Sequence, residues 1–229
     1  MVRALLDGSK TQTRRVMKPQ PEATPSDYPG PAGHWWPSKA HQSMLHIENE
    51  MQKWTGLAGH ACPYGQPGDR LWVRETWQYY GWSDEGEPQI RFSADNATTR
   101  PSVPIEKAGQ VESAWIDLSS SANYNIDNHA RDRRWRPSIH MPRWSSRILL
   151  EITGVRVERL QAITEADARA EGITDGGCTN CGNPEPCGCA DPAPSARDAF
   201  CHLWGKINGA GSWDANPWVW VVAFKRVMP

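Results

Sequence analysis

The chain has 229 residues, of which 38% are hydrophobic, and its formal net charge at pH 7 is −1. A charge this close to zero excludes a global basic field, so binding to nucleic acid would have to come from a local patch. The chain contains no apolar run long enough to cross a bilayer and no signal-peptide pattern, so we expect a soluble cytoplasmic protein that does not enter a membrane.

Residues 1–18 predict a short helix that turns into a strand. Apolar side chains at helical spacing in residues 2–6 precede Gly8, and glycine readily takes the left-handed conformation that ends helices. The polar run that follows alternates like a strand and carries the amine of Lys10 and the hydroxyl of Thr13. An amine beside a hydroxyl can act as base and nucleophile once the amine loses its proton; the alternative is a solvated edge strand.

Residues 19–61 are rich in Pro, Gly, His and Trp and show little periodicity. We therefore expect a long loop there, which Trp35, Trp36 and Trp54 hold to the body of the protein. The 19 glycines and 19 prolines of the chain agree with a large share of loop.

A turn signal at residues 67–69 opens the next predicted strand, residues 70–77. Alternation along this strand places Glu75 on the same face as Leu71 and Val73. If that strand opens toward a cleft, Glu75 is a second-choice carboxylate for chemistry there. A hairpin is expected around residues 90–94.

Residues 131–147 hold six arginines and two tryptophans. With Arg14 and Arg15 they form either a basic rim, on which the indole rings stack a base, or a solvated face over tryptophans that anchor a core. The salt dependence of RNA binding would separate the two readings. The binding candidates in this segment are Trp135, Arg136, Arg143 and Trp144.

Two adjacent elements follow, a strand over residues 148–160 and a helix over residues 164–171. Gly154 indicates a bulge or bend in the strand. Thr164 is suited to cap the helix at its N-terminus, and acidic residues occupy the first turn. Glu171 is then the last residue of the helix, next to a reversal of the chain at Gly172.

A cluster of cysteines lies in residues 174–194, a stretch that is too polar to fold alone. Four thiolates satisfy the tetrahedral preference of a structural zinc ion and leave no open position for catalysis. The compact spacing differs from paired Cys-x-x-Cys knuckles, so a segment without metal stays the alternative. The candidate zinc ligands are Cys178, Cys181, Cys187 and Cys189.

The last elements are an amphipathic helix and a buried strand. Residues 195–208 predict a helix whose buried stripe comprises Phe200, Leu203, Trp204 and Ile207. The continuous apolar run over residues 218–224 favours a buried closing strand. Strands dominate and helices do not alternate with them, so we expect an α+β fold in which short helices cover the ends of a curled or closed sheet.

The sequence resembles the ASCH family of the PUA-like superfamily. The pattern Leu-x-Gly-x-Lys-Thr-x-Thr of residues 6–13, the Gly-Asp pair at residues 68–69 and the helix at 164–171 occur in the family's order. The resemblance implies one curled β-barrel domain over residues 1–229, with inserts at about 19–61, 78–140 and 174–194. The length is similar to that of members encoded by phages and prophages, which act in the bacterial cytoplasm.

Within that family, the opening motif and the late helix resemble those of small bacterial N4-acetylcytidine amidohydrolases. The resemblance implies that Lys10, Thr13 and Glu171 are catalytic, without an organic cofactor. We therefore expect hydrolysis of an acylated pyrimidine nucleoside or a related small amide. The alternatives are a module that binds single-stranded RNA or a modified base without turnover, and a ribonuclease.

Amide hydrolysis assigns a role to each residue. Thr13 would attack, Lys10 would accept its proton, and Glu171 would hand a proton to the leaving amine. Backbone N–H groups near Gly8 would stabilise the oxyanion. Because residues 10 and 13 have opposite parity on a strand, Lys10 has to lie in the turn for both side chains to meet. The candidates for substrate contact on this side are Thr11, Arg14, Arg15 and Glu75.

Overall fold

The computed structural model of the protein describes residues 1–30, 32–38, 43–49, 60–82, 88–99, 135–173, 189 and 195–227. The chain divides into two compact units. The first comprises mainly residues 3–69 and 151–225, and the second mainly residues 70–150. None of the helices in the ranges above combines the length and the hydropathy that crossing a bilayer requires.

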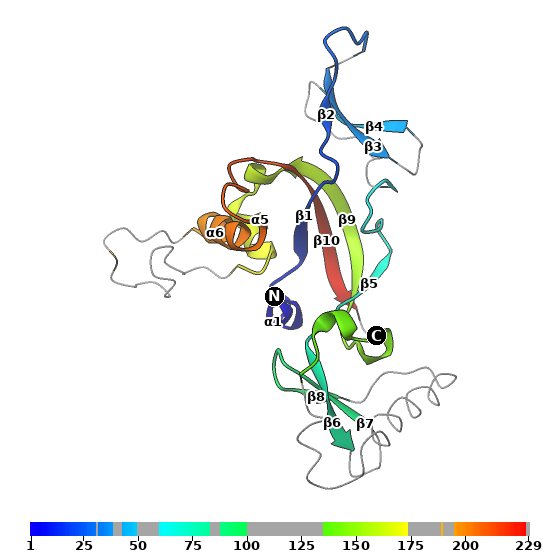
Figure 1. The fold of residues 1–229 in the computed structure, drawn as a ribbon, viewed down its shortest axis with the longest axis vertical. Coiled ribbons are helices and arrows are strands. Elements are labelled where there is room, and N and C mark those ends of the chain that lie inside the picture. Colours follow the sequence, from blue (N-terminus) through cyan, green and yellow to red (C-terminus); the bar gives the residue numbers. More distant parts are fainter. Residues whose placement is uncertain are drawn as a thin grey trace. The chain divides into compact units, whose positions relative to one another are not determined.

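The elements follow one another along the chain as Figure 1 labels them. They are α1 (Val2–Leu6), β1 (Gln12–Val16), β2 (Glu22–Ala23), β3 (Gly33–Ser38), β4 (Ser43–Asn49), β5 (Arg70–Trp72), β6 (Trp77–Trp82), β7 (Pro88–Phe92), β8 (Thr98–Thr99), the 3₁₀ turns η3 (Ser138–His140) and η4 (Arg143–Ser145), β9 (Leu149–Arg159), the 3₁₀ turn η5 (Leu160–Ala162), α5 (Glu165–Ala170), α6 (Ala196–Asn208) and β10 (Trp218–Val227).

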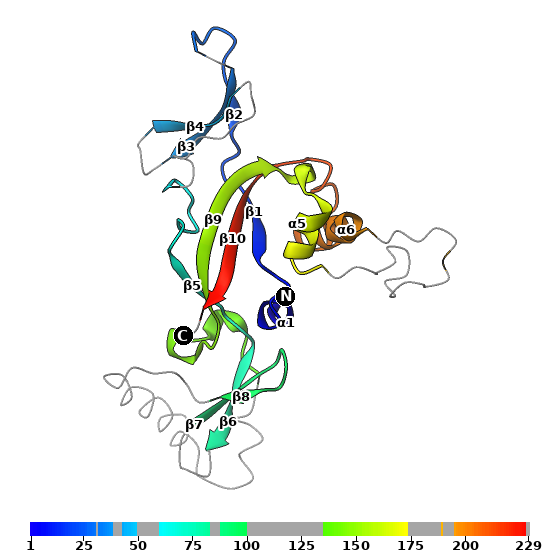
Figure 2. The ribbon, with the colours of Figure 1, turned by 180° about the vertical axis from the view of Figure 1, so that it is seen from behind.

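The largest sheet has the strand order β1-β10-β9-β5 and forms a strongly curled antiparallel half-barrel. β9 and β10 carry the curvature, as Figures 1 and 2 show from opposite sides. β1 pairs with β10 so that Gln12 lies opposite Ala223 and Val16 opposite Val219. The expected α+β class, with a curled sheet and a few short helices, is confirmed.

The burial pattern of β9 changes near Gly154, where a bulge or bend is predicted. Leu150 and Ile152 are buried, and then the buried positions shift to Val155 and Val157. Regular strand alternation keeps one parity, and an additional residue, as in a β-bulge, changes it. The shift turns the polar residues of the second half of β9 toward α5.

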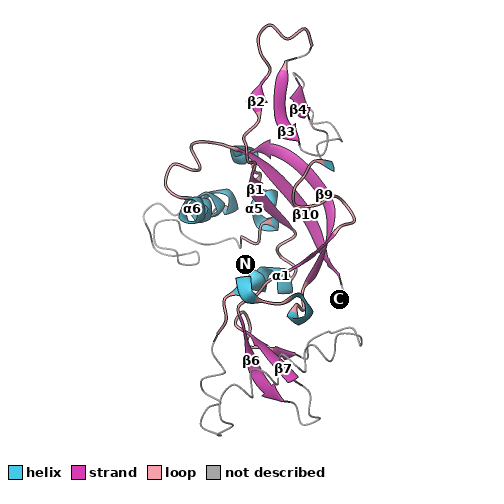
Figure 3. Cartoon of the chain, turned by 45° about the vertical axis from the view of Figure 1, so that its right-hand side comes forward, coloured by secondary structure: helices cyan, strands magenta, loops and turns pink. Residues whose placement is uncertain are grey.

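The helices α5 and α6 pack together on the half-barrel (Figure 3). The cap of α5 is as predicted, because the Thr164 side chain accepts from the Asp167 N–H while the Asp167 carboxylate accepts from the Thr164 N–H. Phe200 and Trp204 of α6 are buried in the same apolar cluster as residues of α5 and β10. The buried closing strand β10 is also confirmed.

The prediction for the exposed half of α6 is wrong. Leu203 is 41% exposed and Ile207 is 64% exposed, although both lie on the apolar stripe. Helical periodicity defines an apolar face, but it does not determine how far the neighbouring elements extend over that face. This part of α6 therefore presents large apolar side chains to solvent.

The prediction of a long loop at residues 19–61 is wrong as well, because β2, β3 and β4 form a three-stranded sheet there. The sequence signal for these strands is weak, because aromatic, histidine and proline residues occupy positions where β-branched residues usually indicate a strand. Trp36 does anchor the segment, as expected. Its indole N–H donates to the Pro19 carbonyl at 2.9 Å, and its ring meets that of Trp220 edge-on at 5.2 Å.

In the second unit, β6, β7 and β8 form another three-stranded sheet, which includes the hairpin expected near residues 90–94. The strand expected over residues 70–77 ends at Trp72 instead, and β6 begins at Trp77. Glu75 lies between these two strands, where its buried carboxylate forms an ion pair with Arg147.

Candidate functional site

Lys10 and Glu171 meet where the turn before β1 lies against the end of α5. The Lys10 ammonium donates to Glu171 Oε2 at 2.7 Å and to the Glu171 carbonyl at 2.8 Å. The two side chains are only 6% and 5% exposed. Backbone hydrogen bonds hold this junction, since Lys10 N–H donates to Ala4 and Thr11 N–H donates to Ala170.

Gly172 makes this close approach possible. Its φ is +84°, a conformation that residues with a Cβ rarely adopt. A Cβ at this position would lie 2.9 Å from Ala4 Cβ and 3.1 Å from Lys10 Cβ. The reversal predicted after Glu171 therefore needs a glycine for both its dihedral angle and its space.

Arg14 connects the Glu171 carboxylate to the sheet. Its guanidinium donates to Glu158 at 2.6 Å and 3.1 Å and to Glu171 Oε1 at 3.3 Å. It also lies 3.4 Å from Asp167, and its side chain is 0% exposed. The alternative of a solvated face is therefore wrong for Arg14, because its guanidinium is buried among three carboxylates.

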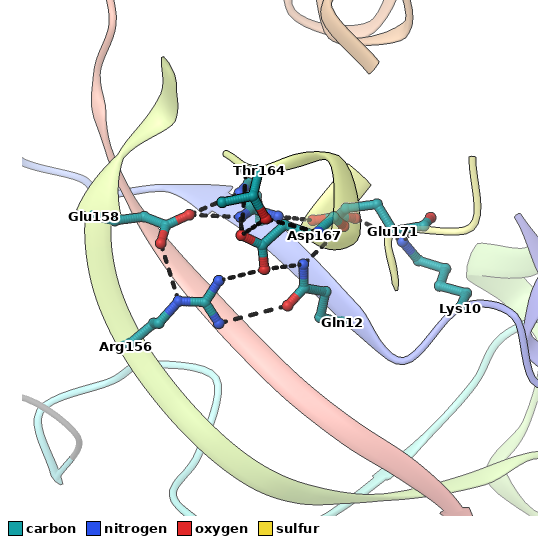
Figure 4. A network of polar contacts seen from close by, with 8 residues as sticks. Lys10, Gln12, Arg156, Glu158, Thr164, Asp167 and Glu171 are labelled. Atoms are coloured by element: carbon teal, nitrogen blue, oxygen red, sulfur yellow. Dashed lines mark hydrogen bonds and ion pairs between the residues drawn. The ribbon is translucent and has the colours of Figure 1, made fainter. Parts of the chain in front are cut away.

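The remaining members of the network lie between β1, β9 and α5. Gln12 donates to the Asp167 carbonyl at 2.8 Å and to its carboxylate at 3.0 Å. Arg156 donates to Asp167 at 2.7 Å and to Glu158 at 3.0 Å. Figure 4 shows these contacts. We call the set the polar cluster; it consists of Lys10, Gln12, Arg14, Arg156, Glu158, Asp167 and Glu171.

The polar cluster shifts the pKa of two of its members. Burial raises the pKa of Asp167, but hydrogen bonds from Gln12 and Thr164 and the charge of Arg156 outweigh burial and lower it to about 2. Burial likewise lowers the pKa of Arg156, but the carboxylates of Glu158 and Asp167 raise it above its ordinary value. Both groups are therefore fully charged in the folded protein near neutral pH.

A pocket of about 560 Å³ lies beside the polar cluster and is lined by residues of the first unit alone. Its lining includes Lys10, Thr13 and Glu171, so the three predicted catalytic residues border one pocket, although Glu171 is far from the other two in the sequence. Within the described residues, the Thr13 hydroxyl makes no hydrogen bond. It is therefore available to a bound molecule.

The parity problem of Lys10 and Thr13 is resolved by the turn. Thr13 lies within β1, opposite Val222, whereas Lys10 precedes the strand and forms an isolated bridge with Glu171. The alternation that directs Gln12 and Arg14 into the polar cluster directs Thr13 to the other face of the strand. Lys10 and Thr13 thus reach one pocket around the edge of β1.

The expected source of the oxyanion donors is wrong for the backbone that follows Gly8. Ser9 N–H donates to the Asp7 carboxylate at 2.8 Å. Lys10 N–H and Thr11 N–H donate to backbone carbonyls, each also at 2.8 Å. These donors are occupied by the contacts that build the turn.

The other predicted binding residues divide between the two units. Thr11 is exposed and is absent from the lining, whereas Arg15 is exposed and belongs to it. The candidates on the arginine-rich segment belong to the second unit. There Trp135 is exposed, and the Arg136 guanidinium lies 5.7 Å from the centre of the Trp77 ring.

For the rest of that segment, Arg143 is exposed within η4, and the side chain of Trp144 lies outside the described residues.

Glu75 does not lie on a strand that opens toward a cleft. It is buried, and Arg147 donates to its two carboxylate oxygens at 2.8 Å and 3.0 Å. Its negative charge is therefore paired with the Arg147 guanidinium of the same unit.

The predicted zinc ligands are not tested. Cys178, Cys181 and Cys187 lie outside the described residues, and only Cys189 falls within them. The prediction of a zinc site therefore stays a prediction.

Four members of the polar cluster were not predicted from the sequence, namely Gln12, Arg156, Glu158 and Asp167. A signal was present in two strands. Gln12 and Arg14 alternate with Thr13 on β1, and Arg156 and Glu158 alternate with buried valine on β9. Polar residues at alternate positions of two strands normally indicate a solvated face, so pattern alone could not distinguish a buried network from a wet surface.

Comparison of the chain with protein-family models, curated proteins and solved structures yields no match. The structure supports only the coarse architecture that the resemblance to the ASCH family implies. That architecture is a curled four-stranded antiparallel half-barrel.

Proposed function

We propose that this protein hydrolyses an amide bond in an acylated pyrimidine nucleoside, with N4-acetylcytidine as the representative substrate, and that its half-barrel is of the PUA-like ASCH type. One observation carries the proposal. Lys10, Thr13 and Glu171 line a single pocket, and the Lys10 ammonium lies 2.7 Å from the Glu171 carboxylate.

The Lys10–Glu171 contact supplies a path for the proton that the reaction has to move. Transfer of one proton from Lys10 Nζ to Glu171 Oε2 leaves a neutral amine and a carboxylic acid. The amine accepts the Thr13 hydroxyl proton while the oxygen attacks the acyl carbon. The Glu171 acid then protonates the leaving N4 amine, and the C–N bond breaks.

Water completes the cycle by attacking the acyl ester on Thr13. Proton transfer along the Lys10–Glu171 contact again supplies a base for the water and an acid for the Thr13 oxygen. The products are the free acid and the regenerated hydroxyl. Lys10 is cationic whenever the tetrahedral oxyanion exists, so it can provide the stabilisation that the occupied backbone N–H groups cannot.

Arg14 has the geometry of a positioning residue. It contacts Glu171 Oε1 at 3.3 Å, which leaves Oε2 for Lys10. Because Glu158 of β9 anchors the same guanidinium at 2.6 Å, Arg14 ties the Glu171 carboxylate to the sheet.

The pocket agrees with a small organic substrate. Its volume of about 560 Å³ falls within the range of about 300–1,000 Å³ that is usual for such sites. Its polar side carries Lys10 and Glu171, and Phe200 and Trp204 contribute to an apolar side. Few polar groups beside an apolar wall are the usual means of orienting a ring.

The test is incubation of the full chain with N4-acetylcytidine, followed by chromatography for cytidine and acetate. Thr13→Val removes the hydroxyl but keeps the shape, so we expect a loss in kcat of at least about a thousandfold. Thr13→Ser retains a nucleophile and keeps part of the activity. Lys206→Gln, an exposed change on α6 outside the pocket lining, is the control.

Hydrolysis that survives Thr13→Val would contradict the assigned nucleophile. Circular dichroism and urea unfolding of each variant separate loss of chemistry from loss of fold. Because the Thr13 hydroxyl makes no hydrogen bond in the described part of the chain, Thr13→Val should unfold at the same urea concentration as the parent protein.

A second candidate, binding of a modified base without turnover, is favoured by one observation. Both oxygens of the Glu171 carboxylate are engaged by cations, Lys10 and Arg14, as in a purely structural network. Binding without hydrolysis of N4-acetylcytidine would support this candidate. Ribonuclease activity has less support from Arg14, because three carboxylates already surround its guanidinium.

A further inference from the structure

The mouth of the pocket has an excess of positive charge. Arg15 and Lys18 belong to the lining and are exposed, and neither makes an ion pair with a described residue. The one acidic residue of that lining, Glu171, is committed to Lys10 and Arg14. In a chain whose net charge is −1, this local excess is a property of the pocket and not of the whole surface.

The side of the pocket formed by α6 is apolar. Leu203 and Ile207 stand one helical turn apart, line the pocket and are 41% and 64% exposed. Exposed large apolar side chains that meet in a cavity favour a ligand with an apolar or aromatic body. The pocket therefore combines an anion-binding edge with an apolar wall.

The spacing along β1 relates the cations to the proposed nucleophile. Thr13 and Arg15 project from the same face of the strand and lie about 7 Å apart. The sugar and base of a single nucleotide lie between its phosphate and its N4 amide. A phosphate at Arg15 can therefore accompany an N4 acyl group at Thr13.

We propose that the pocket takes a phosphorylated substrate, an N4-acylated pyrimidine nucleoside monophosphate, whose phosphate binds Arg15 and Lys18. The base and acyl group lie against Leu203 and Ile207. The choice of a pyrimidine rests on the proposed function; the anion-binding edge rests on charge and exposure alone. Phosphate contacts with two cations are charge-assisted hydrogen bonds, the stronger class.

Protection of the sheet edge is the competing role for these cations. β1 is an edge strand of the half-barrel, and Arg or Lys on an edge strand hinders pairing with another chain. That role predicts faster aggregation when the cations are neutralised, but it predicts no preference for a phosphorylated ligand. The two roles thus differ in a measurable quantity.

The experiment measures binding by calorimetry at low salt, with N4-acetylcytidine and its 5′-monophosphate as the two ligands. We expect the monophosphate to bind at least about tenfold more tightly to the full chain. Arg15→Gln/Lys18→Gln should remove this preference. Lys206→Gln/Lys225→Gln removes the same charge from exposed positions outside the lining and should retain it.

Equal affinities for the two ligands would overturn the inference, as would a preference that survives Arg15→Gln/Lys18→Gln, or no detectable binding of the monophosphate. Tight binding of the monophosphate without hydrolysis would sustain the inference and contradict the proposed function instead. A higher salt concentration should weaken the monophosphate more than the nucleoside, because only one ligand carries the anion.

Discussion

Each of the two compact units buries a glutamate against a cation, and the two arrangements differ in what surrounds the pair. In the second unit, Arg147 contacts both oxygens of Glu75 and both oxygens of Asp95, and its guanidinium lies 4.0 Å from the centre of the Phe92 ring. In the first unit, the oxygens of Glu171 are divided between Lys10 and Arg14.

The difference shows what turns a buried ion pair into a candidate site. Glu75 is fully enclosed, and the charges near it are satisfied by one another. Glu171 lines a pocket together with Lys10 and with Thr13, a hydroxyl that has no partner in the described ranges. Of the two buried carboxylates, the one beside a cavity is therefore the stronger candidate for a functional role.

The largest expected difference between the two units appears when each glutamate is neutralised in turn. Glu171→Gln should lower kcat by at least about a hundredfold, because the proton path is lost. Glu75→Gln should leave kcat of the folded protein unchanged. Steady-state kinetics on N4-acetylcytidine measures both, and equal losses in the two variants would remove the distinction between the two units.

The next effect is on stability and concerns the closed pair. Arg147→Met leaves Glu75 buried without its counter-charge, so we expect a loss of about 3–5 kcal/mol in the free energy of unfolding. Arg70→Met, an exposed change in the same unit, should cost less than about 0.5 kcal/mol. Urea denaturation of the two variants gives these values, and similar values for both would show that the pair is dispensable.

A third prediction uses the pKa of Asp167, which is lowered to about 2 from 3.8. A lowered acid pKa stabilises the folded state above pH 4, and this stabilisation disappears as the pH falls toward 2. Its size is on the order of 2 kcal/mol. Unfolding measured from pH 6 to pH 2 should show this dependence in the parent protein and a weaker one in Asp167→Asn.

The smallest expected effect concerns Arg14 as a positioning residue. Arg14→Lys keeps the charge but cannot reach Glu158 and Glu171 with one planar group. We expect kcat to fall about tenfold while KM stays the same, because the change displaces the Glu171 carboxylate without touching the substrate. A rise in KM at constant kcat would indicate direct contact with substrate instead.

A separate measurement tests the zinc site predicted for the cysteine segment. If Cys178, Cys181, Cys187 and Cys189 hold zinc, protein purified without chelator should contain about one equivalent. A closed site of four thiolates stays largely occupied, so less than about half an equivalent would contradict it.

The elements that the sequence predicted well are those with local signals. Thr164 and Gly172 define both ends of α5, because a cap and a left-handed glycine act within one turn. The apolar run of β10 is equally self-contained. The sheet formed by β2, β3 and β4 has no such signal, since pairing between distant strands stabilises it and side-chain alternation is irregular there.

The residues of the candidate site likewise differ in whether a local sequence signal predicts them. Lys10, Thr13 and Glu171 could be named from short motifs, but their partners could not. Arg14 was expected at the surface, and it is buried because residues from β9 and α5, far along the chain, supply its carboxylates. The exposure of Leu203 and Ile207 depends on which neighbours fail to cover α6, and no pattern within one helix contains that information.

The contact between Lys10 and Glu171 spans 161 positions of the sequence, and this has a consequence for synthesis on the ribosome. Domains fold as their chain emerges from the N-terminal end, so the Lys10 ammonium has no counter-ion from Glu171 until residue 171 has been synthesised. We therefore expect a fragment that ends before residue 171 to lack this contact and, with it, the activity proposed for the pocket.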